Sequence, residues 1–179
     1  HNLFLTPLEI IREFKIGDLI LIDFNSALLK VANVSKFESE GYIECKVLIS
    51  GFIGGRKAVH IDGFSNLPVF SKKDFKAIEL AKKYNIDTFT LSFIRRKEDV
   101  ELFKTFYPEA IIYSKIEVKS AIENLIEILK LSDGILIDRG DLSKEIPVEK
   151  IPFTQKYAIN QARKMGKEVF VATNTLEKM

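Results

Sequence analysis

The sequence after residue 65 alternates between short apolar runs and amphipathic runs, and this alternation restricts the fold more than any other feature. The runs follow one another as helix 71–85, strand 87–93, helix 96–106, strand 110–116, helix 120–132, strand 134–138, helix 147–166 and strand 168–173. Ser71 precedes the first helix as a candidate N-cap. Strands and helices that alternate at this spacing predict parallel strands joined by right-handed crossovers. Both an open doubly wound sheet and a closed (βα)8 barrel fit.

The residues before 65 have a different pattern, in which short β-like runs are separated by turn-like segments. The predicted strands cover 18–23, 27–34 and 41–50, and a short helical pattern covers 7–18. His60 falls in a stretch that resembles a turn, where we expect a surface position. The chain is therefore expected to contain a small, mostly antiparallel β domain over 1–64 and an α/β domain over 65–179.

Polar residues stand at the carboxyl end of every predicted parallel strand. Ser92 ends the first strand, Lys115 and Glu117 end the second, the tripeptide 139–141 follows the third, and Thr173 ends the fourth. A parallel strand that is buried on both faces has no packing reason to end in this way. Because function collects at the carboxyl ends of such strands, these residues form the candidate site.

The segment YSKIEV places a lysine and a carboxylate two residues apart, so Lys115 and Glu117 point to the same face of their strand. Glu117 and Asp141 on one rim suit a divalent cation such as Mg²⁺, which prefers oxygen ligands. The lysine would then neutralise charge on an anionic substrate. Two plainer interpretations stay open: a simple Lys115–Glu117 ion pair, and Asp141 as a helix N-cap before Pro147.

Composition narrows the class of protein. The 179 residues carry a net charge of +2 with mixed signs along the chain, so we expect no nucleic-acid partner. The single cysteine, Cys45, excludes an internal disulfide and a cysteine-based zinc site within this chain and fits a reducing compartment. No apolar run reaches the length of a membrane span, and the N-terminus has no signal-peptide pattern. We therefore expect no membrane partner.

Six segments of the sequence together resemble the pyruvate kinase family. They are NLPVFSKKD, LSFIRRKEDV, YSKIEVKSAIENLIEIL, SDGILIDRGDL, EIPVEKIPFTQK and VATNTLEKM, and they occur in the family's order and near its spacing. The resemblance implies an α/β fold that is part of a (βα)8 TIM-type barrel with a small inserted all-β domain. Residues 1–64 resemble most of that inserted domain, called the B domain, and residues 65–179 resemble barrel strands four to seven.

The resemblance also implies an activity and its requirements. The family transfers a phosphoryl group from phosphoenolpyruvate to ADP, giving pyruvate and ATP in glycolysis. It uses Mg²⁺ or Mn²⁺, and also K⁺, whose ligands we expect on barrel strands outside these 179 residues. A cytoplasmic location and a homo-oligomer of the complete protein are the corresponding expectations. Whether the 179-residue chain is active by itself stays open.

Roles carry over to matching residues only as implications of the resemblance. Lys115 matches a lysine that stabilises charge during phosphoryl transfer, and Thr173 matches a threonine near the reacting carbon. Glu117 and Asp141 match the two carboxylates that hold the divalent metal.

The same resemblance implies which residues bind the substrate. Arg139 and Gly140, together with Asp141, match the segment that flanks the substrate carboxylate, and Ser92 matches a serine under the substrate pocket.

Several positions depart from the family's pattern. Val118 stands in place of an asparagine, Asp138 in place of a small residue, Ser143 in place of a glycine and Asn174 in place of a glutamine, and the segment IDFNS lacks the usual DDG turn. Two alternatives therefore accompany the leading interpretation. One is a metal-dependent lyase or aldolase that acts on a 2-keto acid, and the other is an inactive pyruvate-kinase-like fragment that only binds a ligand.

Overall fold

A computed structural model describes most of the chain and divides it into two compact units, His1–Leu67 and Pro68–Met179. The described residues are 2–6, 8–23, 26–55, 57–61 and 68–172. The boundary expected between residues 64 and 65 falls among residues outside this set, so the domain limits stay a prediction. Part of the IDFNS segment and the pair Thr173–Asn174 also lie outside the described residues.

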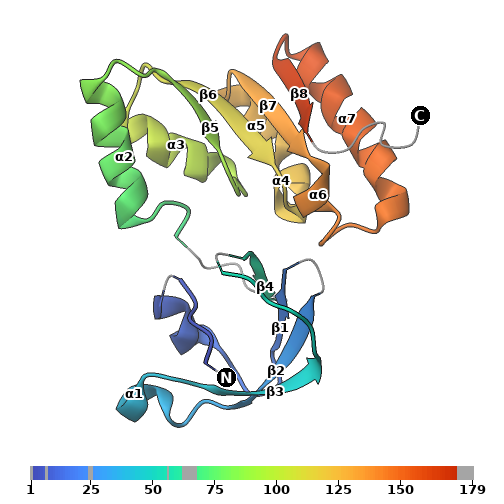
Figure 1. Ribbon diagram of the computed structural model, residues 1–179. Coiled ribbons are helices and arrows are strands. Elements are labelled where there is room, and N and C mark those ends of the chain that lie inside the picture. The colour runs from blue at the N-terminus through green and yellow to red at the C-terminus, as the bar shows by residue number, and fades with distance from the viewer. Residues whose placement is uncertain (1, 7, 24–25, 56, 62–67, 173–179) are drawn as a thin grey trace. The chain divides into compact units, whose positions relative to one another are not determined.

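The first unit is built on a four-stranded antiparallel sheet (Figure 1). Its elements are η1 (Leu8–Glu13), β1 (Leu19–Ile22), β2 (Ala27–Asn33), α1 (Phe37–Glu40), β3 (Glu44–Ile49) and β4 (Val59–Ile61). The strands lie in the order β3-β2-β1-β4. Alternate residues of β1 and β2, including Ile20, Leu29 and Val31, are buried in a small core.

The sequence predicted three of these strands and missed the fourth. β4 pairs with β1, so that His60 lies opposite Leu21 in a strand and is half-buried, which corrects its expected place in a surface turn. At three residues, β4 is too short to give a clear alternating pattern. The helical pattern expected over 7–18 is realised only as the 3-10 helix η1.

The second unit consists of a four-stranded parallel sheet with helices between the strands (Figure 1). In chain order its elements are α2 (Lys72–Lys83), β5 (Thr88–Leu91), α3 (Lys97–Phe106), β6 (Ile111–Ile116), α4 (Lys119–Glu123), α5 (Leu125–Leu131), β7 (Gly134–Asp138), α6 (Arg139–Leu142), η2 (Val148–Lys150), α7 (Ile151–Lys164) and β8 (Glu168–Ala172). The strand order β5-β6-β7-β8 follows the chain without reversal. A segment of a (βα)8 barrel has this order, whereas a doubly wound sheet reverses at a switch point.

The helices of this unit follow the sequence patterns with three exceptions, one of which is that the helix expected over 147–166 begins as the 3-10 helix η2 and continues as α7. Ser71 caps α2 as expected: its hydroxyl accepts from the Asp74 amide at 3.3 Å, and the Asp74 carboxylate accepts from the Ser71 amide at 2.7 Å. The helix expected over 120–132 is interrupted at Asn124 and forms α4 and α5. The sequence pattern did not predict α6, which consists of the segment RGDL.

Strand β6 shows how the sheet positions the site. Ile112, Ser114 and Ile116 are fully buried, and both isoleucines belong to the core that contains residues of α3, α5 and α7. Ser114 shares a 2.7 Å hydrogen bond with Ser132, which satisfies both buried hydroxyls. Tyr113 and Lys115 alternate with these residues and so lie on the opposite face of the sheet. The packing of the apolar face thus fixes the face on which Lys115 stands.

Candidate active site

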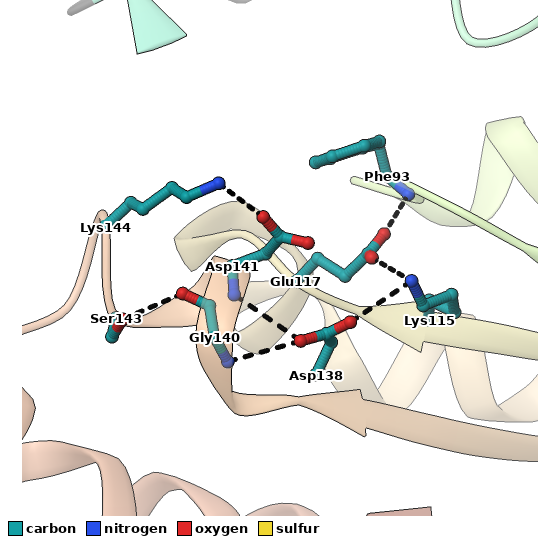
Figure 2. Close-up of polar contacts among 8 residues, drawn as sticks. All are labelled: Phe93, Lys115, Glu117, Asp138, Gly140, Asp141, Ser143 and Lys144. Atoms are coloured by element: carbon teal, nitrogen blue, oxygen red, sulfur yellow. Dashed lines mark hydrogen bonds and ion pairs between the residues drawn. The ribbon is translucent and has the colours of Figure 1, made fainter. Parts of the chain in front are cut away.

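The carboxyl ends of β6 and β7 bring charged side chains together, and the end of β5 adds a backbone amide (Figure 2). Lys115 is the fifth residue of β6, and Glu117 follows the last residue of the same strand. Their side chains form an ion pair, as expected for residues two apart in extended backbone. The sequence prediction that both point to one face is confirmed.

Glu117 is the most buried charged residue of this group, with 1% of its surface exposed. Its Oε2 accepts a 2.6 Å hydrogen bond from the backbone amide of Phe93, which follows β5. Burial raises the pKa of Glu117, while the Lys115 ammonium and the Phe93 amide act in the opposite direction. The nearby Asp141 charge raises the pKa further. A cation close to Glu117 would favour its charged form.

Phe93 supplies this amide from an unusual backbone conformation. Its φ is +55°, in the left-handed region that bulky residues rarely adopt, and half of its side-chain surface is exposed. The conformation directs the amide at Glu117, so the end of β5 contributes a backbone donor to the site. Sequence patterns carry no signal for a positive φ at phenylalanine.

Lys115 lies between two carboxylates from neighbouring strands. In addition to the ion pair with Glu117, its Nζ is 3.3 Å from Oδ2 of Asp138, the last residue of β7. Burial lowers the pKa of Lys115, but the hydrogen bonds and charges of Glu117 and Asp138 outweigh burial and raise it. The ammonium group is therefore held in its charged form.

The short helix α6 carries the remaining polar groups. The Asp138 carboxylate caps α6, because its Oδ1 accepts from the amides of Gly140 at 3.2 Å and Asp141 at 3.5 Å. Oδ1 of Asp141 accepts from Lys144 at 2.5 Å, and the Ser143 hydroxyl donates to the Gly140 carbonyl at 2.8 Å. Asp141 thus lies inside α6, and Asp138 instead takes the N-cap role that was the plainer interpretation of Asp141.

Three carboxylates of this group meet the requirements of a cation site. Glu117, Asp138 and Asp141 each offer one oxygen, and these oxygens all lie within 4.8 Å of one another. An all-oxygen, anionic donor set suits Mg²⁺ or Mn²⁺. Nearby, the buried Nε of Arg139 has no hydrogen-bond partner among the described residues, so it can donate to an added acceptor.

The structure brings together most of the residues that the sequence predicted for the site. Lys115, Glu117 and Asp141 are in one cluster, and Arg139 and Gly140 precede Asp141 in α6. Ser92 follows β5 as an exposed turn residue, and the contact from this strand end to the cluster comes from the next residue. Thr173 lies outside the described residues. The assigned roles of all these residues stay predictions.

Two contributors were missed as parts of the site. Sequence reasoning noted Asp138 only as a departure from the family pattern and did not identify its contacts with Lys115 and α6. It also did not single out Lys144, although the spacing of three residues from Asp141 allows contact within a helical turn.

Comparisons with known proteins agree with the geometry. The sequence profile of the family described as "Pyruvate kinase, barrel domain" matches residues 1–179. Pyruvate kinase of Staphylococcus aureus strain USA300 is 35% identical over 176 residues, which is 96% of this chain and 30% of the relative. Pyruvate kinase of Staphylococcus epidermidis is 36% identical over 176 residues, which again is 96% of this chain and 30% of the relative. The chain therefore spans 30% of the length of these relatives.

The match and the parallel sheet confirm the predicted fold class, part of a (βα)8 barrel with a small all-β domain. Among the described residues, no helix is both long enough and apolar enough to cross a membrane.

Proposed function

The chain belongs to the pyruvate kinase family, and on that premise we propose that it carries part of the active site for phosphoryl transfer from phosphoenolpyruvate to ADP, giving pyruvate and ATP. The observation that carries the proposal is the Glu117–Asp138–Asp141 cluster beside Lys115, at the carboxyl ends of parallel strands. Phosphoryl transfer depends mainly on positioning and electrostatic stabilisation, and this cluster is suited to both.

The carboxylates provide the negative charge that a divalent cation requires. Glu117, which follows β6, and Asp141 of α6 would hold Mg²⁺ or Mn²⁺. When bound, such an ion polarises oxygens of the substrate and neutralises charge on them. The buried position of Glu117 and its hydrogen bond from Phe93 fix one carboxylate before the ion arrives, so little reorganisation is needed.

Lys115 is the candidate for direct action on the transferred group. Its ammonium lies beside the carboxylate cluster and remains 20% exposed at its side chain, so it can reach an anionic ligand. A fixed positive charge at that place stabilises negative charge that develops during transfer. The other proposed roles rest on the resemblance: Thr173 beside the reacting carbon, and Ser92, Arg139 and Gly140 around the substrate.

The complete protein would need further components that the resemblance implies. These are ADP or ATP as the second substrate and K⁺ as an additional cation. A homo-oligomeric state and a cytoplasmic location belong to the same proposal.

A coupled assay tests the proposal. The complete protein is supplied with phosphoenolpyruvate, ADP, Mg²⁺ and K⁺, and pyruvate is measured through lactate dehydrogenase. Turnover that requires all components and falls by about 100- to 1,000-fold in the Lys115→Met variant supports the proposal. Absence of turnover in the wild-type protein, with Mn²⁺ and oxalate binding retained, would contradict it and would favour the metal-dependent lyase alternative.

A further inference from the structure

Asp138 contacts two parts of the candidate site at once. One carboxylate oxygen, Oδ2, is 3.3 Å from Nζ of Lys115 on the neighbouring strand β6. The other, Oδ1, accepts hydrogen bonds from the amides of Gly140 and Asp141 in α6. Figure 2 shows the carboxylate between the lysine and these amides. Asp138 therefore links the lysine of one strand to the turn that follows the next strand.

The contact with Lys115 restricts a side chain that is flexible by nature. A lysine has four rotatable bonds and a compact charge, so a single carboxylate leaves its ammonium considerable freedom. Here Glu117 and Asp138 approach the ammonium from neighbouring strands. Two anionic partners at the ends of separate strands define the position of Nζ better than one partner can.

The hydrogen bonds that Asp138 accepts from α6 orient Asp141. The first amides of a helix have no partner within the helix, and Asp138 satisfies those of Gly140 and Asp141. This hydrogen bonding fixes the backbone of Asp141, whose carboxylate lies near that of Glu117. The same side chain thus sets the positions of both a cationic and an anionic group.

We propose that Asp138 is a positioning residue of this site, which fixes the position of Lys115 relative to the Gly140–Asp141 turn. The proposal rests on the proposed function for the reaction that Lys115 and Asp141 serve. It assigns Asp138 no direct contact with the substrate or the cation. Its effect on the reaction passes through Lys115 and through the backbone of α6.

Two substitutions remove the charged contact with Lys115 and keep a cap on α6. Asp138→Asn keeps an oxygen that can cap α6 and removes the negative charge beside Lys115, whereas Asp138→Ser keeps a shorter cap and cannot reach Lys115. We expect both variants of the complete protein to lower kcat by about 10- to 100-fold, as losses of supporting contacts commonly do. The KM for phosphoenolpyruvate is expected to change much less. Glu101→Gln, at an exposed position of α3, is the matched control for charge removal.

A double-mutant cycle shows whether Asp138 acts through Lys115. In a Lys115→Met background, Asp138→Asn is expected to change kcat by no more than about twofold, because the group it positions is gone. If the two substitutions instead lower kcat independently, so that their effects multiply, the positioning role is wrong.

Two measurements do not depend on turnover. Mn²⁺ affinity, measured by electron paramagnetic resonance, is expected to stay within about twofold in Asp138→Asn, and a tenfold or greater loss would identify Asp138 as a ligand and overturn the proposal. Labelling by an amine-reactive reagent, quantified at Lys115 by mass spectrometry, is expected to be faster in both variants, because the ammonium has lost a partner. Unchanged labelling of Lys115 in both variants would also overturn the proposed role of Asp138. If the wild-type protein shows no turnover, the proposed function fails while labelling still tests Asp138.

Discussion

At the scale of single residues, the site depends on groups whose positions come from three different strand ends. Glu117 is buried and receives an amide hydrogen bond from Phe93, while Asp141 is half-buried and pairs with Lys144. Hydrophobic packing does not explain the position of either carboxylate. Their proximity to each other is the feature that a cation would use.

Removal of either proposed ligand should abolish cation binding. We expect Glu117→Ala and Asp141→Ala to lose Mn²⁺ binding in electron paramagnetic resonance titrations, because each removes one of the negative oxygens within 4.8 Å of the others. Glu101→Ala, which removes an exposed carboxylate from α3, is the control and should bind as the wild-type protein does. Binding that persists unchanged in both site variants would refute the ligand assignment.

Substitution of Lys115 should affect the reaction more than binding. We expect Lys115→Met in the complete protein to lower kcat by about 100- to 1,000-fold, corresponding to about 2.7–4 kcal/mol of lost transition-state stabilisation. KM should rise far less, because a group that acts on developing charge contributes little to ground-state binding. Steady-state kinetics with phosphoenolpyruvate as the varied substrate give both constants. Normal kcat with a raised KM would mean that Lys115 only binds substrate.

At the scale of elements, local signals in the sequence decide where helices begin. Ser71 and Asp74 form reciprocal hydrogen bonds at the start of α2, which satisfy two backbone amides. Ile78 and Ala81 of this helix are buried, so its start fixes which residues face the core.

Loss of this cap should lower stability by a measurable amount. We expect Ser71→Ala to reduce the free energy of unfolding by about 1 kcal/mol, because one amide of α2 loses its acceptor. The measurement is urea unfolding followed by circular dichroism at the helical band, which reports mainly on the unit that contains α2, α3, α5 and α7. Ser71→Asn keeps a capping oxygen and should retain most of the stability. Equal losses in both variants would show that the hydroxyl is not acting as a cap.

The elements that the sequence predicted are those with enough residues to show a period. Strand β6 and helix α3 were found almost to the residue, because apolar residues recur along them at regular spacing. The three-residue β4 and the four-residue α6 were missed, because neither is long enough for a pattern. The interruption at Asn124 was missed because residues on both sides, Ala121 and Leu125, keep the helical spacing.

For the site, the sequence located residues but could not give their contacts. Lys115 and Glu117 were predicted to share a face because strand side chains alternate, and this is confirmed. The link from Asp138 to Lys115 depends on the register between β6 and β7, which pairs Ile116 with Ile137. Register between parallel strands follows from tertiary packing and has no local signal in the sequence.

At the scale of the whole molecule, the parallel sheet carries half of the strands of a (βα)8 barrel. In the described part of the chain, β5 and β8 are the outer strands of the four-stranded sheet. Outer strands expose backbone donors and acceptors that a closed barrel pairs. Phe170 of β8 is half-exposed, which leaves apolar surface beside one of these edges.

The 179-residue chain expressed by itself is therefore expected to be a poor catalyst. Groups from the other barrel strands would be absent, and unpaired edges would hold the site less rigidly. A displacement of about 1 Å can cost about 100-fold in rate, so loose positioning alone lowers turnover severely. The assay supplies phosphoenolpyruvate, ADP, Mg²⁺ and K⁺ to the purified chain, with the complete protein as the reference. Turnover near the typical enzyme value of about 10 s⁻¹ would contradict this expectation. Size-exclusion chromatography of such an active sample would then show whether a second copy pairs with the edge strands, because completion by a partner requires an oligomer whereas a self-sufficient half-site remains monomeric.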